Sequence, residues 1–301
     1  MSLPIAFHPI YKHPLPEGHR FPMLKYELLP KQLLHEGTAE TTDFFEPDIC
    51  DLKHVLAVHD KTYVSNLMNL TLDLKAARKI GFPLSSELVE REFRIAQGTI
   101  LGCEKSLVGG ISFNIAGGTH HAFTDRGEAF CMLNDQAISA QYLLNKKLAT
   151  KILIVDLDVH QGNGTAEIFA KNDSVFTFSM HGKTNYPFKN ETSDLDIALE
   201  DGCDDARFLS ILVATLPKLI ENQKPDFIFY LAGVDILATD KLGKISCTIN
   251  GCKKRDEIVL SLCKKLEIPV QVSMGGGYSP DIKTIIEAHA NTYRVARGIY
   301  I

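Results

Sequence analysis

The chain has 301 residues, of which 45% are hydrophobic, and a net charge of −5 from 32 basic and 37 acidic side chains. This length allows a sizeable core in one or two domains, and the charge balance excludes a strong pull toward nucleic acid or an anionic membrane. Seven scattered cysteines without a CxxC pair argue against a disulfide framework and a four-thiolate zinc site, and they suit a reducing, cytoplasmic compartment.

The N-terminal segment comes first along the chain, and it has prolines and histidines where a secretory signal needs an apolar core. No uninterrupted apolar run reaches the roughly 18 residues of a membrane-spanning helix. We find no linker, repeat or change of composition, which favours one domain over residues 1–301. Basic clusters at residues 253–255 and 264–265 fall in helical patterns, so we expect them to be solvated helix faces.

Helical and strand patterns then alternate. Apolar periodicity predicts helices over residues 87–107, with Ser86 as N-cap, and over residues 135–144, 205–222, 253–266 and 279–290. Short apolar runs predict buried strands at residues 111–115, 152–155, 175–178, 227–231 and 270–273. This alternation indicates an α/β fold with a mainly parallel sheet.

An unusual loop follows each predicted strand. The five loops read GGTHHAF, DVHQGNGT, SMHGKTNYPF, GVDILATDKLG and GGGYSP. Ligands of open α/β sheets bind beyond the carboxyl ends of the strands. We therefore expect the five loops to meet in one functional site.

Asp156, Asp158 and His160 follow the strand at residues 152–155 at every second position. Strand geometry would point all three side chains to one face, at a cost in desolvation and charge repulsion that a bound cation offsets. A satisfied polar cluster that caps the next helix is the alternative. Asp235 follows another predicted strand and could add a carboxylate. Two aspartates and one histidine leave positions open for water and substrate, which suits catalytic Zn²⁺ or Fe²⁺.

His120 and His121 follow two glycines in the first loop. Adjacent histidines are often incidental, but beside a metal they would be natural general acid and base groups. Asp156 and Asn163 are candidate partners for them, and one charged and one neutral partner could set the two pKa values apart.

Tyr278 follows three glycines in the last loop. A nucleotide-binding loop is a rival interpretation, but the GxGxxG spacing and the P-loop lysine are absent. A flexible segment that presents the phenol to a developing oxyanion fits better, although an aromatic after glycines is often simply packed.

Five motifs, GGTHHAF, AFCMLND, VDLDVHQGNGT, LAGVDILATDKLG and GGGY, resemble the zinc-dependent histone deacetylase superfamily in order and spacing. This superfamily includes bacterial acetoin-utilisation and acetylpolyamine amidohydrolase proteins. The resemblance runs from about residue 7 to the C-terminus, and the compact length and the segment after His181 look most like the class IV branch. It implies a single domain of the arginase/deacetylase fold, with a mainly parallel sheet of about eight strands flanked by helices.

The resemblance also implies roles for individual residues. The zinc ligands would be Asp158, His160 and Asp235. The catalytic set would be His120 paired with Asp156, His121 as general base and acid paired with Asn163, and Tyr278. A structural potassium ion would lie at Asp156, Asp158, His160, Ser179 and Met180. The acyl tunnel would be formed by Phe130, Tyr186, Gly118 and Gly276, and Arg20 would line an internal channel.

Three departures from the family pattern stand out. Ala129 replaces a glycine before the tunnel phenylalanine, Tyr186 lies in a divergent loop, and three glycines rather than four precede Tyr278. None of these departures removes a catalytic group. We therefore expect an active enzyme.

The expected activity is zinc-dependent removal of acetyl or longer fatty acyl groups from the ε-amine of lysine in proteins or peptides. Acetylated polyamines are the alternative substrates, although no long loop insertion typical of such enzymes is found. A non-catalytic module that binds acylated partners would not need the acid and base set, and a two-manganese ureohydrolase would need more carboxylates. The expected partner is an acyl-lysine substrate, without nucleic acid or membrane, and the oligomeric state is left open.

Overall fold

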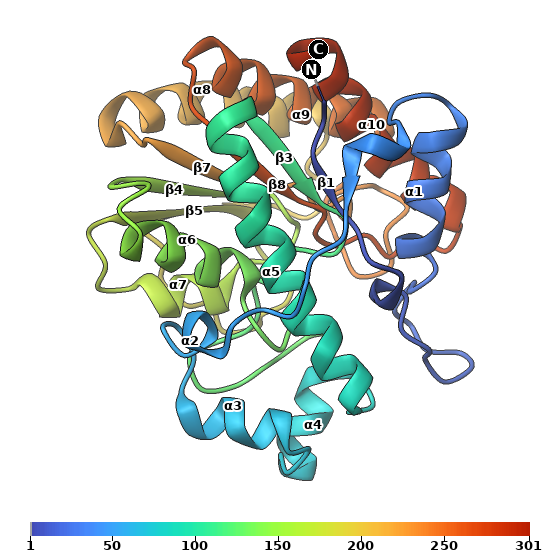
Figure 1. Cartoon of the computed structure of the whole chain (residues 1–301). Helices are drawn as coiled ribbons and strands as arrows, with labels where there is room; N and C mark the ends of the chain where they lie inside the picture. The colour runs from blue at the N-terminus through green and yellow to red at the C-terminus, as the bar shows by residue number, and fades with distance from the viewer. Residues whose placement is uncertain (1) are drawn as a thin grey trace.

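Eight parallel strands form one sheet in the order β2-β1-β3-β8-β7-β4-β5-β6 (Figure 1). The structure is a computed structural model that describes residues 2–301. The strands are β1 (Ile5–Ala6), β2 (Phe44–Phe45), β3 (Ile111–Asn114), β4 (Ile152–Asp156), β5 (Val175–Gly182), β6 (Leu195–Leu199), β7 (Phe227–Leu231) and β8 (Val270–Ser273). The sequence therefore predicted the α/β class and the parallel sheet correctly.

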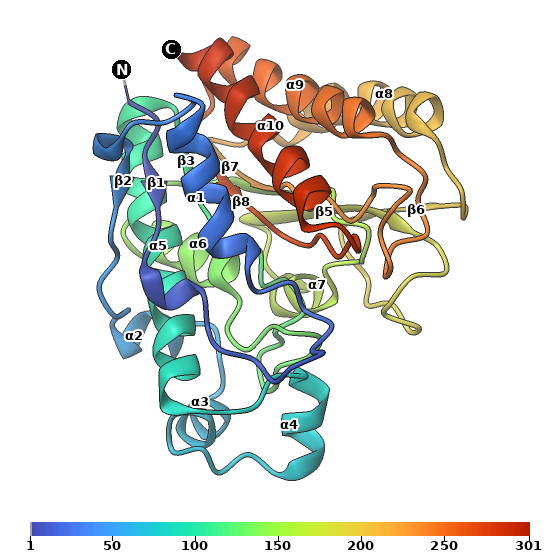
Figure 2. The ribbon, with the colours of Figure 1, turned by 90° about the vertical axis from the view of Figure 1, so that its right-hand side faces the viewer.

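Helices cover both faces of the sheet (Figures 1 and 2). One face carries α1 (Lys25–His35), α8 (Asp205–Gln223), α9 (Ile249–Lys265) and α10 (Ile282–Tyr300). The other carries α5 (Ser86–Gly109), α6 (Asp135–Asn145) and α7 (Asn163–Phe169). Of the short helices, α3 (Lys61–Met68) and α4 (Leu74–Ile80) lie near the N-terminal end of α5, and α2 (Leu52–Val55) packs against α6 (Figure 1).

The central strands are buried along their whole length, because helices shield both faces of the sheet. Every residue of β3, β4, β7 and β8 is buried, and β7 reads FIFYL. Burial on both faces explains why these strands appear in the sequence as continuous apolar runs rather than alternating ones. The edge strand β6 alternates between partly buried and exposed residues and ends in a buried one, and it was not predicted from the sequence.

Several predicted boundaries were wrong for local reasons. The N-cap of α5 is Ser85 rather than Ser86, because the Ser85 side chain accepts a hydrogen bond from the N–H of Leu88 at 3.1 Å. The last helix begins at Ile282 rather than residue 279, with Asp281 as its N-cap. Pro280 explains this shift, since the residue before a proline avoids the helical conformation.

Among the described residues, no helix is both long and apolar enough to cross a lipid bilayer. This agrees with the absence of a long apolar run in the sequence.

Candidate active site

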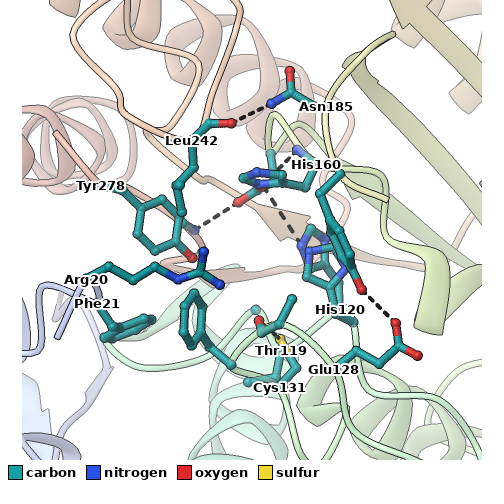
Figure 3. Close-up of a pocket in the computed structure, with 18 of the residues that line it drawn as sticks. Arg20, Phe21, Thr119, His120, Glu128, Cys131, His160, Asn185, Leu242 and Tyr278 are labelled. Carbon is teal, nitrogen blue, oxygen red and sulfur yellow. Dashed lines mark hydrogen bonds and ion pairs between the residues drawn. The ribbon is translucent and has the colours of Figure 1, made fainter. Parts of the chain in front are cut away.

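The loops after β3, β4, β5, β7 and β8 meet at the carboxyl edge of the sheet and surround a pocket of about 580 Å³ (Figure 3). Figure 3 shows Tyr278 and Arg20 on one side of this pocket and His120 and Glu128 on the other. The predicted convergence of the five loops is therefore confirmed. Parallel strands of similar length end at one edge, so segments far apart in the sequence become neighbours there.

Asp158, His160 and Asp235 form a buried cluster whose donor atoms all lie within 4.8 Å of one another. Nδ1 of His160 lies 3.1 Å from Oδ1 of Asp158 and 3.2 Å from Oδ2 of Asp235. Oδ2 of Asp235 is buried and has no hydrogen-bond partner among the described residues. A metal ion would satisfy this oxygen and the charges of both carboxylates, so the donor set fits a catalytic metal with open positions.

The electrostatics of this cluster also favour a cation. Burial, together with the neighbouring Asp158 charge, raises the pKa of Asp235 to about 7. Burial opposes charge on His160, but the adjacent carboxylates of Asp158 and Asp235 outweigh this effect and raise its pKa to about 10. Two carboxylates held this close repel each other, and positive charge between them lowers that cost.

The three residues Asp156, Asp158 and His160 do not share one strand face, contrary to the prediction. Strand β4 ends at Asp156, and the next residues form bends. Within the bend, the N–H of Asp158 donates to Oδ1 of Asp156 at 3.1 Å, and the N–H of His160 donates to Oδ1 of Asp158 at 3.0 Å. Asp156 consequently faces His120, whereas Asp158 and His160 face Asp235.

His120 and His121 lie side by side, with ring centroids 4.1 Å apart. Nδ1 of His120 donates to Oδ2 of Asp156 at 2.7 Å, and Nδ1 of His121 donates to Oδ1 of Asn163 at 2.6 Å. The N–H of Gly164 also donates to this Asn163 oxygen. The carbonyl oxygen of Asn163 can only accept, so Nε2 of His121 keeps a free lone pair.

The two histidines differ in basicity, as the sequence predicted. Burial is the largest effect that lowers the pKa of His121 well below its usual value, and the charges of the nearby His120 and His160 lower it further. Burial also acts on His120, but the Asp156 carboxylate overcomes it and raises the pKa of His120. At neutral pH, His121 is therefore the neutral member of the pair and can accept a proton.

Tyr278 and Phe130 line the pocket together, with ring centroids 6.1 Å apart. Phe21 and Phe82 extend this aromatic wall, since the Phe21 ring lies 5.0 Å from each of the Phe82 and Phe130 rings. Phe21 was not predicted from the sequence to line the pocket. The feature that could have indicated it is its position in the segment GHRFPM, next to Arg20. The backbone at Ala129 has a φ of 43°, in the left-handed region that favours glycine.

Tyr186 also lines the pocket, on the side of the histidines. Its ring stands edge-on to His121 with centroids 5.0 Å apart, and its hydroxyl donates to Oε2 of Glu128 at 2.6 Å. Gly118 and Gly276 line the pocket as well. At Gly118 the φ is 98°, and a Cβ there would lie 3.0 Å from Cα of Gly275, so this close approach of two loops needs glycine.

The loops after β3, β7 and β8 are supported by polar side chains that were not predicted from the sequence. Asp135 accepts hydrogen bonds from the N–H groups of Gly118 and Thr119, both at 2.9 Å. Asp240 accepts from the N–H of Tyr278 at 2.6 Å. Two further buried residues donate to backbone carbonyls of these loops: Arg255 to Gly233 in the loop after β7, and Lys25 to Gly275 in the loop after β8.

Arg20 was expected to line an internal channel, and this was wrong. Its side chain is exposed at the pocket mouth, where the guanidinium carbon lies 5.0 Å from the centre of the Phe130 ring. Lys25 is a buried cation near the site, and its Nζ donates to the carbonyl of Gly275 at 3.1 Å. Burial lowers the pKa of Lys25 to about 8.

The residues predicted to hold a potassium ion lie close together. Asp156 pairs with Ser179 in the β4–β5 register, and Met180 follows in β5. All five of these residues are buried: Asp156, Asp158, His160, Ser179 and Met180. Their role in binding potassium stays a prediction.

Comparison with known proteins gives a consistent result. A model of the histone deacetylase domain matches residues 19–293. An uncharacterized protein of Picosynechococcus is 44% identical over the whole length of both chains. Histone deacetylase 2 of Arabidopsis thaliana is 28% identical, with 89% of this chain and 72% of the relative covered. Acetoin utilization protein AcuC of Staphylococcus xylosus is 26% identical, with 86% and 73% covered.

A solved structure agrees in fold. The crystal structure of a histone deacetylase homologue from Aquifex aeolicus superimposes with a TM-score of 0.85 at 23% identity. The match covers 99% of this chain and 84% of that one. The fold is therefore the arginase/deacetylase fold that the motifs predicted.

Proposed function

The chain belongs to the histone deacetylase family and is a deacetylase, and we propose that it removes acyl groups from the ε-amine of lysine with the help of zinc. The observation that carries the proposal is the buried Asp158–His160–Asp235 cluster beside the free Nε2 of His121 and the aromatic wall with Tyr278. Zinc held there would supply Lewis acidity that polarises the amide carbonyl and makes water more acidic.

His121 is proposed as the general base. Its neutral Nε2 accepts the proton of the attacking water, and Asn163 keeps the ring in the tautomer that leaves this nitrogen free. The same histidine, once protonated, gives a proton to the departing lysine amine. His120 next to it is proposed to carry positive charge, stabilised by Asp156, and so to favour the negative charge that develops on the carbonyl oxygen.

Tyr278 is proposed to stabilise the oxyanion of the tetrahedral intermediate through its hydroxyl. Burial raises the pKa of this phenol well above its usual value, so it stays a hydrogen-bond donor at neutral pH. The N–H of Tyr278 is held by Asp240, which fixes the backbone that presents the ring.

The pocket reaches from exposed residues at its mouth, such as Arg20 and Lys241, to the buried Tyr26 and Arg91. This depth supports acyl chains longer than acetyl and is compatible with the proposed class IV relationship. We further propose that potassium binds at the Ser179 site and that the enzyme works in the cytoplasm.

Hydrolysis of lysine peptides that carry acyl chains from acetyl to myristoyl tests the proposal. A chelated sample and a zinc-restored sample run beside the native protein, and N-acetylated polyamines form a parallel series. Zinc-dependent release of the carboxylic acid, which leaves a free lysine amine on the peptide, supports the proposal, and the chain-length profile then reports how much of the pocket is used. Turnover of polyamines without turnover of any peptide would overturn it.

A further inference from the structure

The mouth of the pocket is lined by four cationic side chains, although the chain as a whole has a net charge of −5. We call these residues the cationic rim: Arg20, Lys79, Lys241 and Lys244. All four are exposed. They come from the N-terminal loop, from α4 and from the loop after β7, so the charge gathers at the mouth only through the fold.

Glu128, the acidic side chain at the same mouth, already accepts hydrogen bonds from neighbouring side chains. Among the described residues that line the pocket, the acidic ones are Asp158 in the metal cluster and Glu128. Oε1 of Glu128 accepts from Lys79 at 3.2 Å and from Arg126 at 2.9 Å, and Oε2 accepts from Tyr186. Glu128 is therefore a poor partner for a cationic substrate, because its oxygens are engaged by three donors.

Two members of the cationic rim are available to a ligand. In the part of the chain that the structure describes, no carboxylate oxygen lies within 4.0 Å of the charged groups of Arg20 or Lys241. Figure 3 shows the Arg20 guanidinium reaching into the pocket mouth beside Tyr278. Lys244 is more engaged, since its Nζ donates to Oγ1 of Thr184 at 2.7 Å and lies 3.8 Å from Asp201.

We propose that the acylated amine of the substrate is carried on an anionic scaffold, with carboxylates close to the acyl-lysine that meet the cationic rim. This inference rests on the proposed function and narrows its substrate class. A polyamine carries several positive charges beside its acylated nitrogen, and the rim repels them. An acyl-lysine flanked by aspartate or glutamate places opposite charge there instead.

The expected size of the effect follows from Coulomb's law in a solvated setting. One charge pair at about 6 Å in water changes binding about threefold, and the effect falls as added salt screens it. Two flanking carboxylates should therefore change kcat/KM by about tenfold between acidic and neutral peptides at low salt.

The test uses three peptides that share one acyl-lysine and differ only in flanking Glu, Gln or Lys residues. At low salt, kcat/KM should fall in the order Glu, Gln, Lys, and the three values should converge at about 1 M salt. The kcat/KM values of free acyl-lysine, with and without a blocked α-carboxylate, show whether a single carboxylate on a small molecule is enough to raise the rate. Equal rates or the reverse order at low salt would overturn this inference alone, whereas no hydrolysis of any peptide would overturn the proposed function with it.

Charge reversal at the rim gives a second readout. Lys241→Glu should lower kcat/KM for the Glu peptide about tenfold and raise it for the Lys peptide. Lys265→Glu makes the same charge change at the end of α9, near the opposite edge of the sheet, and is the matched control. If both variants alter the peptide preference equally, the effect is one of overall charge and the inference fails.

Discussion

The backbone N–H of Gly276 donates a hydrogen bond of 2.8 Å to Oδ2 of Asp158, although 118 residues separate the two in the sequence. This bond joins the glycine loop after β8 to the loop after β4, which carries Asp158 and His160. The approach is possible because residue 276 has no side chain: a Cβ there would overlap Oδ2 of Asp235.

Gly276→Ala should therefore disturb the metal cluster directly. We expect the variant to fold but to lose bound zinc and, with it, activity, because the Asp235 carboxylate must move away. Metal content after dialysis, measured by elemental analysis, checks this. Gly298→Ala in α10 is the control, since its Cβ would meet nothing within 4 Å and it should bind metal normally. Full metal occupancy in Gly276→Ala would contradict the account of the site.

Tyr278→Phe should lower turnover about a hundredfold or more, because loss of one oxyanion donor typically costs about 3 to 4 kcal/mol in the transition state. KM should change much less than kcat. Tyr142→Phe removes a hydroxyl from α6, where it bonds to Glu104, and should leave turnover unchanged. Wild-type turnover of a metal-loaded Tyr278→Phe protein would show that the hydroxyl has no such role.

Removal of the metal should destabilise the protein as well as inactivate it. A ligand that binds only the folded state stabilises it by about 2.7 kcal/mol at a hundredfold excess over Kd, so zinc should raise the Tm of a chelated sample. Asp235→Asn keeps the oxygen that accepts from the N–H of Val159 but removes the charge. We expect this variant to show little response of Tm to zinc, and an undiminished response would place the metal elsewhere.

His59 should make stability depend on pH. Its Nδ1 donates to the carbonyl of Phe123 at 2.8 Å, and its Nε2 accepts from the N–H of Asn134 at 3.0 Å, so the fold requires the neutral ring. Burial lowers the pKa of His59 to about 4 from an ordinary value of 6.5. Between pH 6.5 and 4 the unfolded chain therefore binds a proton that the native state does not bind. The neutral His59 ring contributes about 3 kcal/mol to the free energy of unfolding above pH 6.5, and this contribution is lost as the pH falls to 4.

Denaturant unfolding at several pH values between 4 and 7 measures that slope. In His59→Gln the decline over this range should be shallower than in the wild-type protein, whatever the absolute stability of the variant. Identical slopes would show that other groups bind the protons.

That the candidate site residues lie together was largely predictable from the sequence, because they occur in short local motifs at the ends of strands. Asp158, His160, His121 and Asn163 all occur within or next to glycine-rich loops after strands. The directions of the side chains were less predictable. Strand β4 ends at Asp156, so the strand alternation that was expected to place Asp156, Asp158 and His160 on one face does not continue. The loop contacts, rather than the strand period, bring them together.

The supporting residues could not be predicted from the sequence. Lys25 lies in a helical segment like many exposed lysines, and its partner, the carbonyl of Gly275, is 250 residues away. Arg255 belongs to a basic cluster that suggested a solvated face, yet it is fully buried next to Asp256. No local pattern separates a buried charge from an exposed one when its partners come from distant loops.

The position of β8 in the sheet bears on how the chain is made. This strand is synthesised last but lies between β3 and β7, so a nascent chain that ends before residue 270 has two separate groups of strands, β2-β1-β3 and β7-β4-β5-β6. The histidine pair follows the first group, and Asp158, His160 and Asp235 follow strands of the second. The enzyme therefore cannot become active on the ribosome until its last strand has emerged and joined the two groups.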